Sequence, residues 1–133
     1  MAIILDADVI IRGEKGAFDL KAWLGKQSDK LFEVAAITVA ELWHGVERAG
    51  APHGNRRLQY LEGLLAPLPI IPYTEQTAYV HARLWAELEA TGKMLGAYDL
   101  IVAATALERD SEVATFNERH FGIVPGLQIV RPE

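Results

Sequence analysis

The stretch Ala2-Ile3-Ile4-Leu5-Asp6 decides the fold, because it is a short apolar run that ends directly on a carboxylate. An uninterrupted apolar run of this length is typical of a buried strand. Similar short apolar or β-branched runs recur at Leu31 to Ile37, Leu68 to Ile71, Glu112 to Thr115 and Leu127 to Val130. Because helical patterns lie between most of these runs, the sequence predicts an α/β fold.

Two segments have clear helical patterns. From Thr74 to Thr91, residues at helical spacing form one apolar face that includes Trp85. The segment from Leu100 to Leu107 is apolar nearly all round. A helix without a polar face is expected to be buried, so we expect Asp99 to lie at the entrance of a central helix.

Acid or amide side chains lie where the expected strands end and helices begin, at Asp6, Glu41, Asp99 and Asn117. The carboxyl ends of parallel strands meet at one edge of a sheet, so these residues are expected to converge in one crevice. Carboxylates that converge repel one another, and a hard divalent cation relieves that repulsion. The sequence therefore predicts a shared, oxygen-rich metal site.

Each of these residues also has a purely structural interpretation, which the sequence leaves open. Thr38-Val39-Ala40-Glu41 matches a capping box, in which the threonine and glutamate side chains bond free amides at a helix start. Asp6 and Asn117 can cap the elements that follow them, and the helix dipole favours Asp99 in a first turn. If each residue were only a helix cap, however, there would be no reason for all four to lie at equivalent positions, where a strand ends and a helix begins.

The composition fits one folded domain over residues 1–133, with 50% hydrophobic and 23% charged residues. The absence of cysteine excludes disulfides and thiolate-based zinc or catalytic chemistry. The apolar run before Asp6 is too short for a signal peptide, and no stretch approaches the ~20 residues needed to span a bilayer. We therefore expect a cytoplasmic protein with no membrane partner.

The formal net charge of −5 argues against a protein that holds long nucleic acid by electrostatics alone. It does not exclude a nuclease, because metal binding would reverse the local effect of the acids in the site. Several basic residues are candidates for the rim of that site, although a solvated helix face is an equally simple interpretation of the Arg56-Arg57 pair. These candidates are Arg12, Lys15, Arg48, Arg56, Arg57 and Lys93.

Four segments taken in order resemble one known family. They are Ile4-Leu5-Asp6-Ala7-Asp8-Val9-Ile10, then Ile37 to Gly45 around Glu41, then Gly96-Ala97-Tyr98-Asp99 with the apolar helix behind it, and finally Ala114 to Leu127. No single segment is specific, but the ordered set resembles PIN-domain ribonucleases, in particular the VapC-type toxins of type II toxin-antitoxin systems.

The resemblance implies a three-layer α/β/α sandwich around a mainly parallel sheet of four to five strands. It implies that Asp6, Glu41 and Asp99 hold Mg²⁺ or Mn²⁺, and that Asn117 takes part in catalysis at the same site. Many members carry aspartate at this fourth position, so the amide removes one charge and leaves the number of ions open. Asp8 is expected to have a secondary role, behind these four.

The activity implied is metal-assisted hydrolysis of an RNA phosphodiester by an endoribonuclease. The partners implied are an RNA substrate, a small cognate antitoxin protein and a second copy in a homodimer. Exposed aromatic residues such as Trp43, Tyr60 or Trp85 are candidates for protein contacts, although core packing is expected for at least two of them.

Two other functions remain open at the level of sequence. A PIN-like module that binds RNA or protein without cutting it would agree with Asn117 and with the acidic net charge. An aspartyl phosphatase of the haloacid-dehalogenase type would use Asp6 as nucleophile and Asp8 as general acid, but it gives Glu41 no role. His44, which follows Glu41 at Glu-x-x-His spacing, is expected to be a packing or rim residue because no second such motif exists.

Overall fold

Five short strands form one sheet in the computed structural model, which describes residues 2–133. The strand order is β3-β2-β1-β4-β5, and every neighbouring pair is parallel. The strands are β1 (Ala2–Leu5), β2 (Leu31–Ala35), β3 (Ile70–Ile71), β4 (Glu112–Ala114) and β5 (Ile129–Val130). Each lies within a run that the sequence predicts to be a strand, which confirms the α/β prediction.

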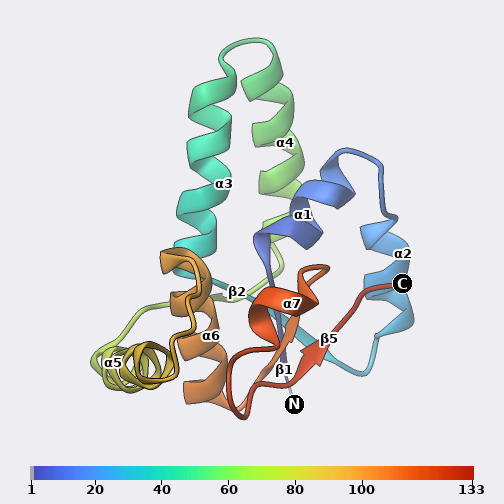
Figure 1. Cartoon of the computed structure of the whole chain (residues 1–133). Coiled ribbons are helices and arrows are strands. Elements are labelled where there is room, and N and C mark those ends of the chain that lie inside the picture. The colour runs from blue at the N-terminus through green and yellow to red at the C-terminus, as the bar shows by residue number, and fades with distance from the viewer. Residues whose placement is uncertain (1) are drawn as a thin grey trace.

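Helices cover both faces of this sheet (Figure 1). They are α1 (Ala7–Glu14), α2 (Leu20–Lys26), α3 (Ala36–Ala49), α4 (His53–Leu65), α5 (Glu75–Ala90), α6 (Ala97–Arg109) and α7 (Glu118–Phe121). Helices α3 and α4 lie side by side and project from the sheet as a hairpin.

The alternation of side chains along β1 separates two cores. Ile3 and Leu5 pack into one core with buried residues of α1, α2, α3 and α4. Ile4 points to the opposite face and packs with buried residues of α5 and α6. Because successive residues of a strand face opposite sides, a wholly apolar strand requires helices on both faces. The three-layer α/β/α sandwich is therefore confirmed.

Helix α6 is the buried helix that the sequence predicts. Leu100 and the unbroken run from Val102 to Ala106 are buried, while Asp99 in its first turn is half-buried. The carboxylate of Asp99 thus stands where the central helix emerges from the core.

Helix α5 begins and ends where predicted, but the predicted apolar face coincides only in part with the buried side of the helix. Thr74 and Thr77 form a capping box at its start. Thr77, Leu84 and Leu88 are the buried residues of α5, whereas Trp85 is 54% exposed. Apolar residues lie on more than one side of this helix, so spacing alone did not identify the side that packs on α6.

The order of the strands creates a switch point beside β1. From β1 the chain builds outward through β2 to β3 on one side, and through β4 to β5 on the other. In sheets of this kind the loops after the strands diverge at the switch point and leave a crevice at the carboxyl edge. Asp6 follows β1 and Thr115 follows β4, so both lie at this edge. Over residues 2–133, no helix combines the length and the apolar character that a membrane crossing needs.

Candidate active site

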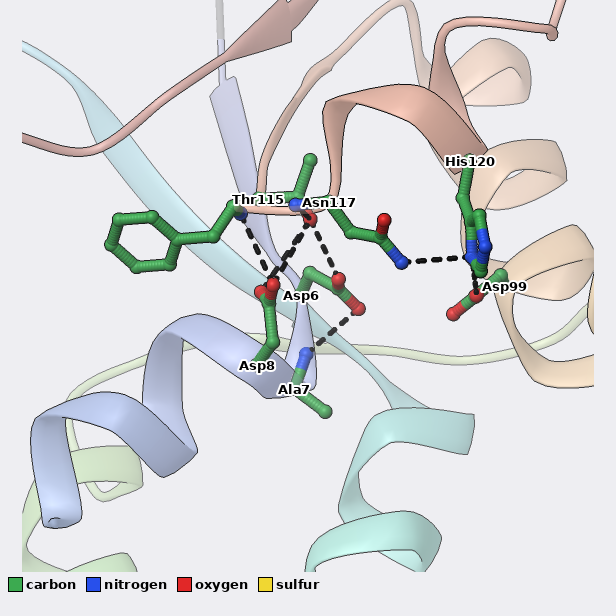
Figure 2. A network of polar contacts seen from close by, with 8 residues as sticks. Asp6, Ala7, Asp8, Asp99, Thr115, Asn117 and His120 are labelled. Atoms are coloured by element: carbon green, nitrogen blue, oxygen red, sulfur yellow. Dashed lines mark hydrogen bonds and ion pairs between the residues drawn. The ribbon is translucent and has the colours of Figure 1, made fainter.

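Asp6 lies at the junction of β1 and α1 (Figure 2) and is only 5% exposed. Its Oδ1 accepts a hydrogen bond from the backbone N–H of Ala7 at 2.9 Å, and its Oδ2 accepts one from the hydroxyl of Thr115 at 2.9 Å. Asp6 is therefore the N-cap residue of α1, as its structural interpretation predicts. Capping does not exclude a role in the site, because each carboxylate oxygen has more than one lone pair.

Thr115 fixes the orientation of the Asp6 carboxylate. The backbone N–H of Asn117 donates to the Thr115 hydroxyl oxygen at 2.9 Å, which directs the hydroxyl proton toward Asp6. Asp8 lies against the same hydroxyl, with Oδ1 at 3.4 Å, and its Oδ2 accepts the backbone N–H of Phe116 at 3.1 Å. Asp8 is thus held beside Asp6, and its secondary role stays a prediction.

Asp99, Asn117 and His120 form the other side of the site. Figure 2 shows Asn117 extending from the turn after β4 toward His120, which lies above Asp99. Asn117 Nδ2 and His120 Nδ1 are 2.8 Å apart, and His120 Nδ1 lies 3.8 Å from Asp99 Oδ2. Asn117 precedes α7 but makes no side-chain capping bond to it. Its amide therefore contacts the His120 side chain of α7, which lies beside Asp99, and does not cap the backbone of that helix.

Glu41 does not form the predicted capping box, so that interpretation is wrong. Helix α3 begins at Ala36, which places Thr38 and Glu41 inside the helix and not at its cap. In residues 2–133, the buried side-chain polar atoms without a hydrogen-bond partner are Thr38 Oγ1 and Glu41 Oε1. A buried carboxylate oxygen without a donor is costly, and a cation is one way to satisfy it.

We refer to Asp6, Asp8, Glu41 and Asp99 as the acidic cluster. Burial, followed by the charge of Asp8, raises the pKa of Asp6 to about 8, although the Thr115 hydrogen bond opposes this. Burial and the charge of Asp99 raise the pKa of Glu41. Burial also raises the pKa of Asp99, and His120 opposes that shift. The acidic cluster therefore resists full ionisation, as predicted for carboxylates that converge.

The acidic cluster has the ligand chemistry that Mg²⁺ and Mn²⁺ prefer, namely carboxylate oxygens with room for water. Across residues 2–133, no group of three Asp, Glu or His side chains already has its ligating atoms gathered around one point. The unpartnered Glu41 Oε1 and the raised pKa of Asp6 both fit residues that would gain from a nearby cation.

An open groove leads away from the acidic cluster along Glu41 and Asp99. Its volume is about 300 Å³, and Gly96, Ala97 and Tyr98 complete its lining. Tyr98 is 53% exposed, so a phenol ring borders the groove. A substrate can reach the acid side chains from this direction.

The structure also sorts the residues that stand outside the cluster. His44 is exposed on α3, which agrees with a rim position. Glu33 is a buried acid on β2, but Arg109 donates to both of its oxygens, at 3.2 and 2.6 Å, so its charge is already satisfied.

Thr115 and His120 were not predicted as site residues. Thr115 follows a strand end just as Asp6 does, so the same positional rule would have identified it, whereas His120 carries no comparable signal.

Comparison with known proteins agrees with this geometry. A sequence model of the PIN domain family matches residues 3–126. The VapC ribonuclease Y4jK of Sinorhizobium fredii is 34% identical, over 98% of this chain and 96% of the relative. The tRNA(fMet)-specific endonuclease VapC of Salmonella typhimurium is 35% identical, over 72% of this chain and 71% of the relative.

Solved structures extend the likeness to three dimensions. The DNA-bound VapBC structure from Salmonella typhimurium superposes with a TM-score of 0.89 at 27% identity, over 98% of each chain. VapBC2 from Rickettsia felis, bound to a promoter fragment, gives a TM-score of 0.92 at 22% identity over 100% of each chain. The chain belongs to the PIN-domain family. Within that family it groups with the VapC ribonucleases.

Proposed function

We propose that this chain is a Mg²⁺- or Mn²⁺-dependent endoribonuclease and the toxin of a toxin-antitoxin pair, acting in the cytoplasm as one nuclease domain over residues 1–133. The observation that carries the proposal is the acidic cluster at the switch point of the sheet. Its members come from β1–α1, α3 and α6, and their charges disfavour one another until a cation joins them. The ribonuclease names of the VapC relatives support RNA as the substrate.

In this proposal Asp6, Glu41 and Asp99 hold the ion, and Asn117 is the fourth catalytic residue. When bound by these residues, Mg²⁺ would supply a lowered pKa for a bound water and would offset negative charge on the phosphate. Thr115 keeps the Asp6 carboxylate in one orientation through its hydrogen bond. The Asn117 side chain, which is near His120, can orient a water or a phosphate oxygen with its carbonyl or amide group.

The experiment that tests this proposal is an RNA cleavage assay with tRNA and with single-stranded RNA. We expect cleavage in Mg²⁺, loss of cleavage in EDTA and recovery when Mn²⁺ is added. Asp99→Asn should abolish cleavage, and Glu47→Gln, which removes one exposed acid from the same helix as Glu41, should leave it unchanged. Cleavage that persists in EDTA would contradict the metal-dependent mechanism.

The same assay separates the alternatives. A non-cleaving module, which the uncharged Asn117 favours, would bind the RNA in Mg²⁺ but leave it intact. A phosphatase would hydrolyse a small phosphoester such as para-nitrophenyl phosphate. We expect no such hydrolysis, because within residues 2–133 no lysine forms an ion pair with Asp6 or Asp8.

We also propose a homodimer that uses the exposed apolar side of α5 and the turn after it. Trp85 on α5 is stacked on His81, with ring centroids 5.6 Å apart, and Met94 in the turn is 91% exposed. A cavity of about 470 Å³ lies between Trp85, Met94 and Leu100. Exposed apolar patches of this kind mark protein contacts.

Of the candidate aromatic residues, Trp43 and Tyr60 are half-buried and pack against the core, as expected for two of the three.

Sedimentation velocity tests the homodimer directly. We expect the wild-type chain to sediment as a dimer and Trp85→Glu to sediment as a monomer with unchanged far-UV circular dichroism. A wild-type monomer at all concentrations would contradict this part of the proposal. We expect a small cognate antitoxin that co-purifies with the chain, and the similarity to VapBC-5, described as a member of the VapBC family of toxin-antitoxin systems, supports such a partner.

A further inference from the structure

Two arginine side chains rest against one phenyl ring beside the acidic cluster. Arg12, in the last turn of α1, has its Cζ 4.5 Å from the centroid of the Phe116 ring. Arg131, directly after β5, has its Cζ 5.3 Å from the same centroid. A guanidinium within about 6 Å of an aromatic centroid is attracted to the ring. Phe116 therefore holds two positive charges in one place.

This pair is tied to the acidic cluster through the backbone of Phe116. The Phe116 N–H donates to Asp8 Oδ2 at 3.1 Å, and the Phe116 carbonyl accepts from Arg131 Nη1 at 3.2 Å. Pairing of β4 with β5, in which the Thr115 N–H donates to the Val130 carbonyl at 3.1 Å, brings Arg131 to this position. One residue thus connects the carboxylates with the two cations.

Neither guanidinium is neutralised by a strong partner. Within residues 2–133, Arg12 has no ion pair or side-chain hydrogen bond. Arg131 has a 3.7 Å contact with Glu118, and both side chains of that pair are about half exposed, at 52% and 53%. Exposed pairs of this kind contribute little, typically about 0 to 1 kcal/mol. Both arginines therefore retain donors for another anion.

The other arginines that the sequence suggests for the rim are placed differently. Arg57 is held by both oxygens of Glu14, at 2.9 and 3.2 Å. Arg56 contacts His53 near the start of α4, and Arg48 lies in the last turn of α3. Both therefore lie near the tip of the α3–α4 hairpin, away from the sheet (Figure 1). Of the arginines in that group, Arg12 is the one that the fold ties to the acidic cluster.

We propose that Arg12 and Arg131 form a phosphate clamp that binds the RNA strand next to the bond that is cut, on the Asp8 side of the acidic cluster. The inference rests on the proposed function and names the residues that hold its substrate. A chain of net charge −5 repels RNA, so binding near carboxylates requires local positive charge. A guanidinium can bond two phosphate oxygens at once, and contact with the Phe116 ring limits the side-chain freedom lost on binding. Both arginines are positioning residues and take no part in bond cleavage.

The test measures binding of a fluorescein-labelled, single-stranded RNA by anisotropy in Mg²⁺ at increasing KCl. All variants carry Asp6→Asn so that the strand stays intact. We expect Arg12→Gln and Arg131→Gln each to weaken binding several-fold and to lower the slope of log affinity against log salt by about 0.7, the value for one phosphate contact on a single strand. Arg48→Gln is the matched control, with the same loss of charge near the hairpin tip and no expected change in slope. Arg12→Lys should restore the slope.

Other outcomes are equally clear. If both glutamine variants lower the melting temperature but keep the salt slope, the two arginines only anchor the C-terminal tail and the clamp is wrong. Unchanged slopes with unchanged stability would overturn it as well, and would leave an acidic protein segment as the better ligand. Failure of the wild-type chain to cleave RNA, with the slopes reduced as expected, would reject the nuclease proposal and support the clamp.

Discussion

At the scale of single residues, the hydroxyl of Thr115 connects both sides of the candidate site. The hydroxyl accepts a hydrogen bond from the Asn117 N–H and donates one to the Asp6 carboxylate. It therefore links Asn117, the uncharged residue of the site, to Asp6, its most buried acid. Removing this donor by Thr115→Val should raise the pKa of Asp6 further and weaken Mn²⁺ binding about tenfold, as for other residues that orient a metal ligand. Thr115→Ser keeps the hydroxyl and should retain normal affinity in a calorimetric titration. Equal affinities in all three proteins would show that the hydroxyl does not orient a metal ligand.

The pKa of Asp6 predicts how stability depends on pH. Its folded value of about 8 lies above the ordinary value, so between about pH 4 and pH 8 the folded chain binds more protons at Asp6 than the unfolded chain does. The contribution of Asp6 to stability is therefore fully present below pH 4 and is lost as the pH rises toward 8. Asp6→Asn removes the ionisable group, so the variant should not lose stability in this way as the pH rises. The substitution keeps nearly the same side-chain shape and should abolish metal-dependent cleavage.

Urea unfolding in EDTA measures the effect of Asp6→Asn. The stability of the variant relative to wild type should rise by several kcal/mol between pH 4 and pH 8, because the pKa of Asp6 rises from 3.8 to about 8 on folding and a tenfold change in proton affinity corresponds to about 1.4 kcal/mol. If Asp6 served only as the N-cap of α1, the variant would gain no such pH-dependent stability. A constant difference across this pH range would therefore argue against a raised pKa of Asp6 in the folded chain.

Asn117 determines the charge of the fourth position. Asn117→Asp adds a carboxylate without a change in volume, so it should strengthen Mn²⁺ binding and lower the Mg²⁺ concentration needed for half-maximal cleavage. Calorimetry of both forms checks this, with one ion per chain expected for the wild type. No change in metal affinity would mean that Asn117 lies outside the metal site and serves the turn before α7.

The strand-end rule predicted the residues of the site better than it predicted their contacts. It selected Asp6, Asp99 and Asn117 as candidates because each follows a strand or opens a helix at the carboxyl edge of the sheet, and the structure places all three near one another. It could not place Asp8, whose position depends on the hydrogen bond from the Phe116 N–H, more than a hundred residues away in the chain. Contacts of this kind depend on the loops, which the apolar pattern does not determine.

At the scale of the elements, the start of α3 shows how local and tertiary preferences compete. The sequence favours a capping box at Thr38, yet the N-cap is Ala35, three residues earlier, and the Thr38 hydroxyl is buried without a partner. The helix extends because Thr38, Leu42 and Val46 share its buried face. This shift places Glu41 one turn into the helix, where its carboxylate faces the charge of Asp99.

A pair of matched substitutions tests this account of α3. Thr38→Val removes a buried, unpartnered hydroxyl and should leave stability unchanged or raise it by up to about 1 kcal/mol. Thr74→Ala at the true capping box of α5 should cost about 1 kcal/mol. Both values come from urea unfolding at fixed pH. A loss at Thr38 equal to that at Thr74 would restore the capping interpretation.

At the scale of the whole molecule, the site exists only when the chain is folded. Asp6 follows β1, Glu41 lies within α3 and Asp99 lies in the first turn of α6, so the three acids come from separate elements of the fold. The sequence predicted this architecture well, because buried strands and an apolar helix have few alternative arrangements. It did not predict which side of α5 packs on α6, since apolar residues occur on both sides.

The central claim is that these three carboxylates together hold one divalent ion. Calorimetric titration of Mn²⁺ into the wild type, Asp6→Asn, Glu41→Gln, Asp99→Asn and the control Glu47→Gln tests it most directly. We predict one ion per chain in the wild type and in Glu47→Gln, and affinity at least about tenfold weaker in each of the other three. Wild-type affinity in any of these three would remove that residue from the site, and wild-type affinity in all of them would contradict the claim.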